Sequence, residues 1–595
     1  MVREIPCARS APIALLILAV AAAFAAVASF GCASADALDR RINELVERRS
    51  ASLGPNTVAP RREYPDPESL ERPGQYEKTP ETLNPAASDL YYDVAAEDRD
   101  VAERLAEYAQ VPDTAIQVDL TAAFRLAQQT SREYLTAEEE YILAAIRLLI
   151  ERHRWSPRFF DDLSASVGGS FDEDAETTLR IINELRVTQR LPYGGEVEAA
   201  LIYSATQALR DAVDDEYTQS TALVLSGNIP LLRNAGLIAQ EDLIQAERDL
   251  IYAARQFERF RREFLVDIAS DFFDLVALQA GISNQIASLR SRQESARAEE
   301  ERVEAGRRAA YAARNLRQNV LQAEQQLINQ REAYIIAVDR FKIRLGIPVE
   351  TPVVIIPSTI DPPEPEASPA EAALLAINYR LDLQNERDQI YDNRRAVSNA
   401  RNQLLPDLDL NGAVTLNTFE DADDDTGGFD FRGDNSTYFA SVTFGLPLDR
   451  EIERLNLRSA IISLQRQIRA YSQFRDNIIL DARAQRRRID QQRFALQLAE
   501  ERVALNELRL EQLKLQEGDA LEITTAEDEL LQSKNDVDNA IRDLRVAVLN
   551  YLLTTGQMRV AKEGTFLPLP GMVAATPLDP PVGPPPPPAA APVTN

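Results

Sequence analysis

The feature that most constrains this fold is a long stretch without proline, between Pro447 and Pro568, in a chain that holds 33 prolines. Within it, apolar side chains recur mostly at alternating steps of three and four residues, in the series Ile461, Leu464, Ile468, Tyr471, Ile478, Ala482, Ile489, Leu496, Ala499, Val503, Leu510 and Leu513. Such spacing is typical of a coiled-coil seam, because 3.5 residues per turn keep one stripe facing a partner helix. The pattern predicts a helix over residues 450–517, about 100 Å long.

An earlier proline-free stretch, residues 231–347, repeats this plan. Gly306 lies inside it as Gly518 lies inside the later stretch, and Gly346 near its end corresponds to Gly556. These landmarks recur at a nearly constant offset, which indicates an internal duplication. Each proline-free stretch is expected to form a long helical rod. A glycine inside each rod suits the tight turn between two antiparallel helices, because glycine tolerates a positive φ.

The N-terminus has the pattern of a secretory signal peptide over residues 1–31, with arginines ahead of an apolar run. The run ends at Gly31 before Cys32, which is similar to a bacterial lipoprotein processing site, so Cys32 is the expected site of lipidation. Cleavage after Ala35 by an ordinary signal peptidase is the alternative. No later apolar run approaches 18 residues, so no second helix is expected to cross a bilayer.

The segment boundaries follow from changes in proline content and periodicity. Each repeat is expected to begin with one helix, over residues 119–154 and 370–404, that ends before a proline. A short helix is also expected near residues 38–49. The expected organisation is a signal peptide 1–31, a proline-rich linker 32–116, a first repeat 117–350, a connector 351–368, a second repeat 369–558 and a proline-rich disordered tail 559–595.

Four segments change from the helical period to strict alternation, at about 158–171, 221–229, 407–417 and 436–446. Apolar residues there alternate with small or polar ones, which is typical of a barrel strand with lipid outside and water inside, although a soluble sheet alternates in the same way. Four strands cannot close a barrel, and open edges are costly in lipid. Several subunits must therefore share one barrel, and four strands from each of three subunits would give twelve.

The first strand region is much longer than the second. Its excess includes the turn signal Pro192-Tyr193-Gly194-Gly195, with alternating apolar residues on either side. This excess is either an additional hairpin or a long folded outer loop, and the sequence leaves both open.

Composition argues against several functions. The formal net charge of −29 makes nucleic acid an unsuitable partner, because phosphate contacts need Lys and Arg. A catalytic triad would have to use His153, the only histidine, which has arginine on both sides. The cysteines are Cys7 and Cys32, and no phosphate-binding glycine loop occurs. We therefore expect no enzyme, no cofactor and no metal site.

The order of these features resembles the TolC family of outer-membrane efflux proteins over residues 117–558. The resemblance rests on the duplication, on Leu404-Leu405-Pro406 before a strand, on Leu446-Pro447-Leu448 after one, and on Thr555-Gly556 at the end. It implies a mainly α fold with a membrane β-barrel: a homotrimer whose twelve-stranded barrel in the outer membrane continues as a long antiparallel α-helical coiled-coil tunnel through the periplasm. It also implies a periplasmic adaptor and an inner-membrane RND or ABC transporter as partners.

The resemblance suggests two kinds of site. The helix turns would form the periplasmic tip that docks on the adaptor, at Gly306, Arg307, Arg308, Gly518 and Asp519. A helix hairpin without any such contact is the alternative.

The second site is a gate. The family's gate uses two aspartates six and nine residues after the second tip glycine, where this chain has Thr524 and Glu527. Glu522, Glu527 and Asp528 are therefore the candidate acidic gate, since three copies of an inward carboxylate would make a ring that favours cations. Acids on a solvated helix face are the alternative, and Thr524 departs from the family's pattern.

These expectations lead to a passive outer-membrane channel of a tripartite efflux or type I secretion system. It would be anchored in outer-membrane lipid of a Gram-negative-type bacterium and extend into the periplasm. The alternative is a lipid-anchored periplasmic coiled-coil scaffold without a pore.

Overall fold

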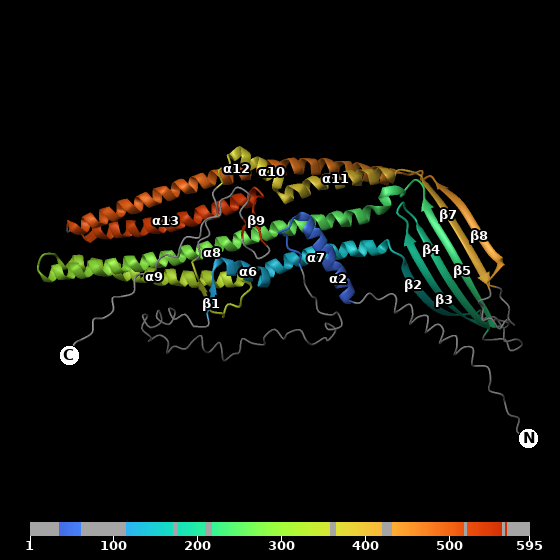
Figure 1. The fold of residues 1–595 in the computed structure, drawn as a ribbon, viewed down its shortest axis with the longest axis horizontal. Coiled ribbons are helices and arrows are strands. Elements are labelled where there is room, and N and C mark those ends of the chain that lie inside the picture. The colour runs from blue at the N-terminus through green and yellow to red at the C-terminus, as the bar shows by residue number, and fades with distance from the viewer. Residues whose placement is uncertain are drawn as a thin grey trace, which may run out of the picture.

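A computed structural model describes residues 35–60, 115–169, 177–208, 217–357, 365–418, 431–516, 520–561 and 566–567. Helices make up one long part of the molecule, and a single large sheet stands at one end of it (Figure 1). Among the described helices, none is both long enough and apolar enough to cross a membrane.

The two halves of the chain present corresponding elements in the same order. The first half contains β1 (Ile116–Val118), α6 (Leu120–Thr130), α7 (Arg132–Arg154), β2 (Arg158–Gly169), β3 (Thr177–Arg190), β4 (Glu196–Ala208), β5 (Tyr217–Pro230), η3 (Gly236–Gln240), α8 (Glu241–Glu304) and α9 (Ala310–Leu345). The second half contains β6 (Val353–Ile355), α10 (Pro369–Tyr379), α11 (Leu381–Asn402), β7 (Asp407–Thr418), β8 (Phe431–Gly445), α12 (Glu451–Leu515) and α13 (Ala520–Thr554). Strands β1 and β6 pair in parallel and join the halves.

The long helices confirm both expectations, the one from the heptad pattern of residues 450–517 and the one from the repeated proline-free plan of residues 231–347. Helix α8 has 64 residues and α12 has 65, so each is about 100 Å long. Helix α9 returns along α8 and α13 along α12, with the turns at the end far from the sheet (Figure 1). Part of the expected seam is buried, including Ile478, Ala482 and Ile489, because it faces neighbouring helices.

The helix that opens each half is broken in two, where the sequence predicted one unbroken helix. The first breaks at Ser131 and the second at Arg380, whose ψ angles of 125° and 122° are extended. A glycine from far along the chain lies against each break: Gly346 packs against Thr130, and Gly556 packs against Tyr379. The close backbone approach explains the breaks, since an uninterrupted helix would occupy the same space.

The chain ends contribute more order than expected. Helix α2 (Ala35–Leu53) confirms the short helix in the linker and buries Val46 in the main core. The tail was expected to be disordered from residue 559, and this is wrong for its first residues, since β9 (Arg559–Val560) pairs with β10 (Phe566–Leu567). Val560 is buried, so apolar burial orders the segment. The main core lies where α2, α6, α7, α8, α9 and α13 meet, and aromatic contacts such as Tyr134 against Phe257 fill it.

Candidate functional site: the open sheet and the helical tip

The sheet has six antiparallel strands in the order β2-β3-β4-β5-β7-β8. The expectation of four strands per chain is therefore wrong, and the twelve-stranded count derived from it does not hold for three such chains. The excess in the first strand region is a hairpin, β3–β4, which pairs with β2 on one side and β5 on the other. The other four strands confirm the segments expected from alternation. The alternation on both sides of the Pro192–Gly195 turn was the signal for the hairpin.

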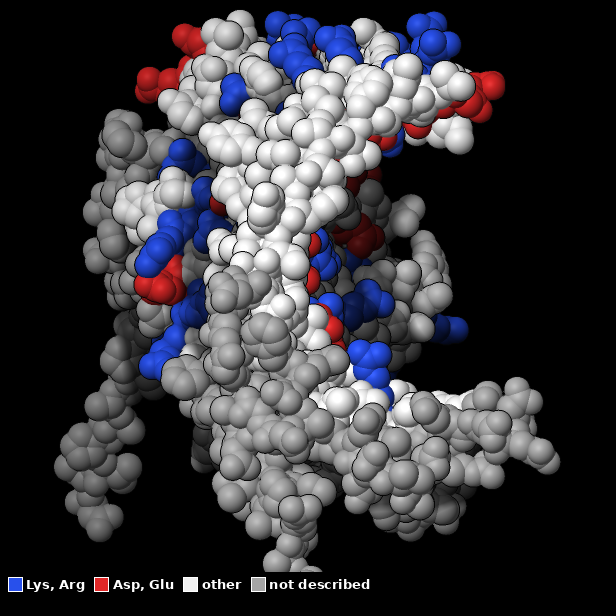
Figure 2. Space-filling view, turned by 90° about the vertical axis from the view of Figure 1, so that its right-hand side faces the viewer, with Lys and Arg blue, Asp and Glu red and all other residues white. Residues whose placement is uncertain are grey.

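One face of the sheet is mainly apolar across all six strands, although it also carries Asp161, which accepts a hydrogen bond from Asn183 at 2.8 Å. The pairing register places these side chains on it: Phe159, Leu163 and Val167 of β2; Leu179, Ile181, Leu185 and Val187 of β3; Val197, Ala199, Leu201 and Tyr203 of β4; Leu223, Leu225 and Ile229 of β5; Leu408, Leu410, Val414 and Leu416 of β7; Tyr438, Val442 and Phe444 of β8. Many of them are exposed. Figure 2, which looks at the sheet end, shows an uncharged band with Lys, Arg, Asp and Glu side chains on both sides of it.

The opposite face is more polar, although it includes apolar residues such as Ile182 and Ile202, and it carries ion pairs near the helical end of the sheet. Arg158 contacts Glu196 at 3.4 Å, and Arg186 contacts Asp162 at 3.1 Å. Both guanidinium groups lie over the ring of Phe160, at 5.4 and 5.2 Å from its centroid. Toward β7 and β8 this face carries mainly Ser, Thr and Asn side chains. A sheet apolar on one face and hydrophilic on the other fits a boundary between lipid and water.

The helical tip exposes the first of the two expected turns. Gly306 has a φ of 71°, which allows the chain to turn from α8 into α9. Gly306 and Arg307 are exposed, and Arg308 is half-buried with its Nε 3.7 Å from Glu299. Gly518 and Asp519 of the second turn lie outside the described residues, as does the expected lipidation site Cys32.

The three candidate gate acids occupy different environments. Glu522 is exposed on α13, and Asp528 is exposed and forms an ion pair with Arg292 of α8. Glu527, in contrast, is only 4% exposed. Thr524, at the other position of the family's gate, accepts a hydrogen bond from Asn319 at 3.1 Å. The structure therefore separates two acids that face outward from one that is packed among helices.

Glu527 connects three helices at the tip. Its Oε1 accepts hydrogen bonds from Ser291 at 2.9 Å and Ser295 at 3.0 Å, both on α8. The same oxygen lies 3.4 Å from the ammonium group of Lys514 on α12. A buried carboxylate with these partners holds α13 against α8 and α12. No local sequence pattern predicts this role of Glu527, because Ser291 and Ser295 lie more than two hundred residues away and Lys514 lies on another helix.

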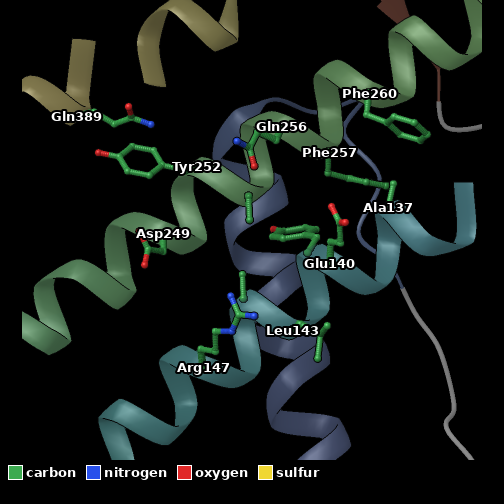
Figure 3. Close-up of a pocket in the computed structure, with 13 residues that line it drawn as sticks. Ala137, Glu140, Leu143, Arg147, Asp249, Tyr252, Gln256, Phe257, Phe260 and Gln389 are labelled. Carbon is green, nitrogen blue, oxygen red and sulfur yellow. The ribbon is translucent and has the colours of Figure 1, made fainter. Parts of the chain in front are cut away.

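A groove of about 520 Å³ lies between α7 and α8, nearer the middle of the molecule. Figure 3 shows side chains of the two helices facing each other across it, with Gln389 of α11 beside Tyr252. Its walls combine Phe257 and Phe260 with charged groups such as Arg147 and Asp249. Within the described residues, no group of three or more His, Cys, Asp or Glu side chains is placed to hold a metal ion.

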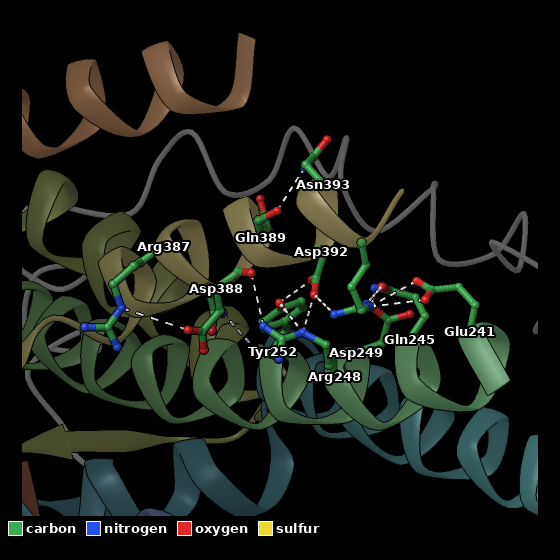
Figure 4. Close-up of polar contacts among 12 residues, drawn as sticks. Glu241, Gln245, Arg248, Asp249, Tyr252, Arg387, Asp388, Gln389, Asp392 and Asn393 are labelled. Atoms are coloured by element: carbon green, nitrogen blue, oxygen red, sulfur yellow. Dashed lines mark hydrogen bonds and ion pairs between the residues drawn. The ribbon is translucent and has the colours of Figure 1, made fainter. Parts of the chain in front are cut away.

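Helices α8 and α11 meet through an ionic seam rather than an apolar one (Figure 4). Asp392 of α11 accepts a hydrogen bond from Tyr252 and pairs with Arg248, both on α8. Further along, Arg255 pairs with Asp388 at 2.7 Å. Burial, reinforced by the hydrogen bond to Asp392, raises the pKa of Tyr252. The seam holds the two halves of the chain together next to the sheet.

The matches to known proteins come from comparison with solved structures, and they support the fold. No family model matches the sequence, and no curated protein sequence does. Among solved structures, CusC, described in terms of transmembrane channel formation, aligns with a TM-score of 0.56 and 13% identity over 74% of this chain and 93% of CusC. The outer-membrane channel OprN aligns with a TM-score of 0.54 and 13% identity over 73% of this chain and 89% of OprN. The open-state outer-membrane channel MtrE of Neisseria gonorrhoeae aligns with a TM-score of 0.53 and 15% identity over 73% of this chain and 89% of MtrE. This chain therefore has the fold of the TolC-family outer-membrane channels.

Proposed function

We propose that this chain forms a passive homotrimeric channel across the outer membrane and periplasm, as part of a tripartite efflux or type I secretion system. The observation that carries the proposal is the direct connection between a sheet apolar on one face and helices about 100 Å long. The sheet would stand in the membrane, and the helices would reach the inner-membrane partner. A periplasmic adaptor and an RND or ABC transporter would supply energy and substrate choice, so the chain itself needs no catalytic group.

Association of several copies is supported by apolar surface that one copy leaves uncovered. Helix α12 exposes large apolar side chains along its length: Ile452, Leu455, Ile462, Leu480, Phe494, Leu505 and Leu508. Exposed apolar patches of this extent mark surfaces that meet another protein or lipid. Helices of neighbouring copies would cover this stripe and complete the wall of a tunnel.

The tip would contain both the docking surface and the gate. Gly306, Arg307 and Arg308, with Gly518 and Asp519 of the other turn, would contact the adaptor. Glu522 and Asp528 are exposed, so three copies of each could form a ring that favours cations. Glu527 would act differently, as the link that keeps α13 in its closed position against α8.

The test is the conductance of the purified full-length protein in a planar bilayer, with its oligomeric state measured in detergent. The expected result is a trimer that resists heating in detergent and conducts with cation selectivity. Extraction from membranes by salt alone, with no trimer and no conductance, would instead support the periplasmic scaffold, in which the sheet packs against soluble protein.

A further inference from the structure

We infer that three copies of this chain close a single eighteen-stranded barrel, in which β8 of each copy pairs with β2 of the next. The inference rests on the proposed trimeric channel and goes beyond it, because it specifies the interface and the width of the pore. The hairpin β3–β4 raises the number of strands per copy from four to six. Its two strands are paired along their length, β3 with β2 and β4 with β3.

Most of each outer edge of the sheet lacks the usual protection against pairing, although β2 begins with Arg158, Asp161 and Asp162 and β8 contains Arg432 and Asp434. Edge strands exposed to water are normally interrupted by proline or protected by charged side chains, since their free N–H and C=O groups attract other strands. Residues 163–169 of β2 contain neither proline nor charge, and the same is true of residues 435–445 of β8. These edges are therefore suited to pairing with another strand.

Side-chain exposure shows where a neighbour is missing. On the apolar face, Leu163 of β2 is 62% exposed and Val442 of β8 is 64% exposed. On inner strands of the same face, Ile181 is 38% exposed and Leu410 is 40% exposed. An inner strand has neighbours on both sides, so the higher exposure at both edges is what one absent neighbouring strand on each side would leave.

Strand direction makes a second copy of this chain the fitting partner. Strand β2 runs away from the helices, whereas β8 runs back toward them (Figure 1). Pairing β8 of one copy with β2 of the next is therefore antiparallel, as every other pair in the sheet is. Both edges also present apolar residues on one face and small polar residues, such as Ser164 and Ser441, on the other. The mainly apolar face of one copy would then meet the mainly apolar face of the next across the junction.

The strand number sets the width of the pore. With strands about 4.8 Å apart and tilted by about 40°, eighteen strands give a barrel about 36 Å across between backbones, compared with about 24 Å for twelve. The added hairpin also places charges on the polar face: Arg180, Glu184, Arg186, Glu196 and Glu198. The outer end of the channel would thus admit hydrated polar solutes too bulky for a twelve-stranded barrel.

Disulfide crosslinking between copies tests the interface. Leu163→Cys is combined in turn with Tyr438→Cys, Ala440→Cys and Val442→Cys in the full-length protein, and the oxidised trimers are separated under denaturing, non-reducing conditions. We expect at least one combination to give covalent dimers and trimers. Leu163→Cys with Leu223→Cys is the matched control, because these residues lie on the same face with two strands between them. Intact trimers that crosslink in none of the combinations would overturn the inference.

Polymer exclusion tests the width. Channel conductance is measured with polyethylene glycols of graded size added on the barrel side, for the wild-type protein and for a deletion of residues 173–212 that removes the hairpin. Because β2 and β5 are themselves antiparallel, the deletion can join them as a hairpin. We expect the wild-type barrel to admit polymers about 1.5 times wider than the variant does.

The outcomes separate the inference from the proposed function. A conducting wild-type trimer that excludes the same polymers as a folded deletion variant would overturn the eighteen-stranded barrel and leave the channel standing. Absence of a wild-type trimer would overturn both. If the deletion variant does not fold, the crosslinks decide, since they use the complete sheet.

Discussion

A β-carbon on Gly346 would stand 2.0 Å from the carbonyl oxygen of Thr130. Gly346 ends α9 with a φ of 78°, and the hydroxyl of Thr130 donates a hydrogen bond to the carbonyl of Leu345 at 2.6 Å. The second half repeats this joint, where Gly556 has a φ of 69° and its added β-carbon would stand 2.9 Å from the carbonyl oxygen of Tyr379. Each joint places the end of a returning helix against the break in an opening helix.

Replacing Gly346 by alanine should destabilise the protein strongly. The left-handed backbone disfavours any side chain, and the β-carbon would collide with backbone that has no rotamer to change. We expect Gly346→Ala to lower the free energy of unfolding by about 2–4 kcal/mol, in the range of overpacking plus backbone strain. Urea denaturation followed by circular dichroism measures this.

Gly281→Ala is the matched control for this prediction. Gly281 lies inside α8, and its added β-carbon would meet only the Asn535 side chain, at 3.8 Å. Alanine favours helix over glycine, so this variant should be more stable by about 0.5–1 kcal/mol. Equal effects of the two substitutions would contradict the role given to the joint.

Arg261 should hold both chain ends on α8. Its guanidinium group is fully buried and donates hydrogen bonds to the carbonyls of Asn56 at 3.1 Å, Val560 at 3.3 Å and Ala561, beside an ion pair with Glu258 at 3.2 Å. Arg261→Met leaves these acceptors without their buried donor, so we expect a loss of about 3–5 kcal/mol. Limited proteolysis should then cut the segments near residues 56 and 561 much faster.

The control for Arg261 is Arg48→Met. Arg48 forms an exposed ion pair with Glu44, which contributes less than about 1 kcal/mol. If both variants are cut at the wild-type rate, Arg261 does not anchor the chain ends.

Removing the Glu527 carboxylate should loosen the packing of α13 against α8 and α12 at the tip. Glu527→Ala leaves the hydroxyls of Ser291 and Ser295 and the ammonium group of Lys514 without their shared acceptor. We expect larger or more frequent conductance steps than in the wild type. Glu522→Ala, on an exposed acid, should instead lower cation selectivity and leave the frequency of opening unchanged. Identical behaviour of the two variants would show that the acids do not divide these roles.

Buried tyrosines should make the protein less stable in alkali. Burial raises the pKa of Tyr134, Tyr141 and Tyr551 above that of an exposed phenol. Below about pH 10 both the folded and the unfolded state hold these protons; above it the unfolded state releases them first, so the free energy of unfolding falls as pH rises. Urea titrations from about pH 9 to about pH 11 measure this fall.

Tyr551→Phe isolates one of these groups. Among the described residues, the buried Tyr551 hydroxyl has no hydrogen-bond partner, so its removal should cost little near neutral pH. Above about pH 10 the variant should lose stability less steeply, by up to about 1.4 kcal/mol per pH unit. If the free energy of unfolding falls with pH as steeply in the variant as in the wild type, Tyr551 has the same pKa in the folded and unfolded states.

The extent of prediction from sequence differed between elements for a physical reason. Helix α12 and strands β2, β5, β7 and β8 follow from the period of their apolar residues, because one buried face imposes that period locally. Helix α8 follows from the repeat of the proline-free plan earlier in the chain. The breaks at Ser131 and Arg380 contain neither proline nor glycine. They are caused by Gly346 and Gly556, which reach them only when the chain has folded back on itself.

The site shows the same division. The residue pattern alone predicted the alternating strands, the long helices after them and the acids near the tip. The folded structure was needed to show that the hairpin β3–β4 joins the sheet, since alternation does not specify which strands pair. It likewise decided that Glu527 faces Ser291 and Ser295 while Glu522 faces outward, because burial of a charged group depends on partners brought from other helices.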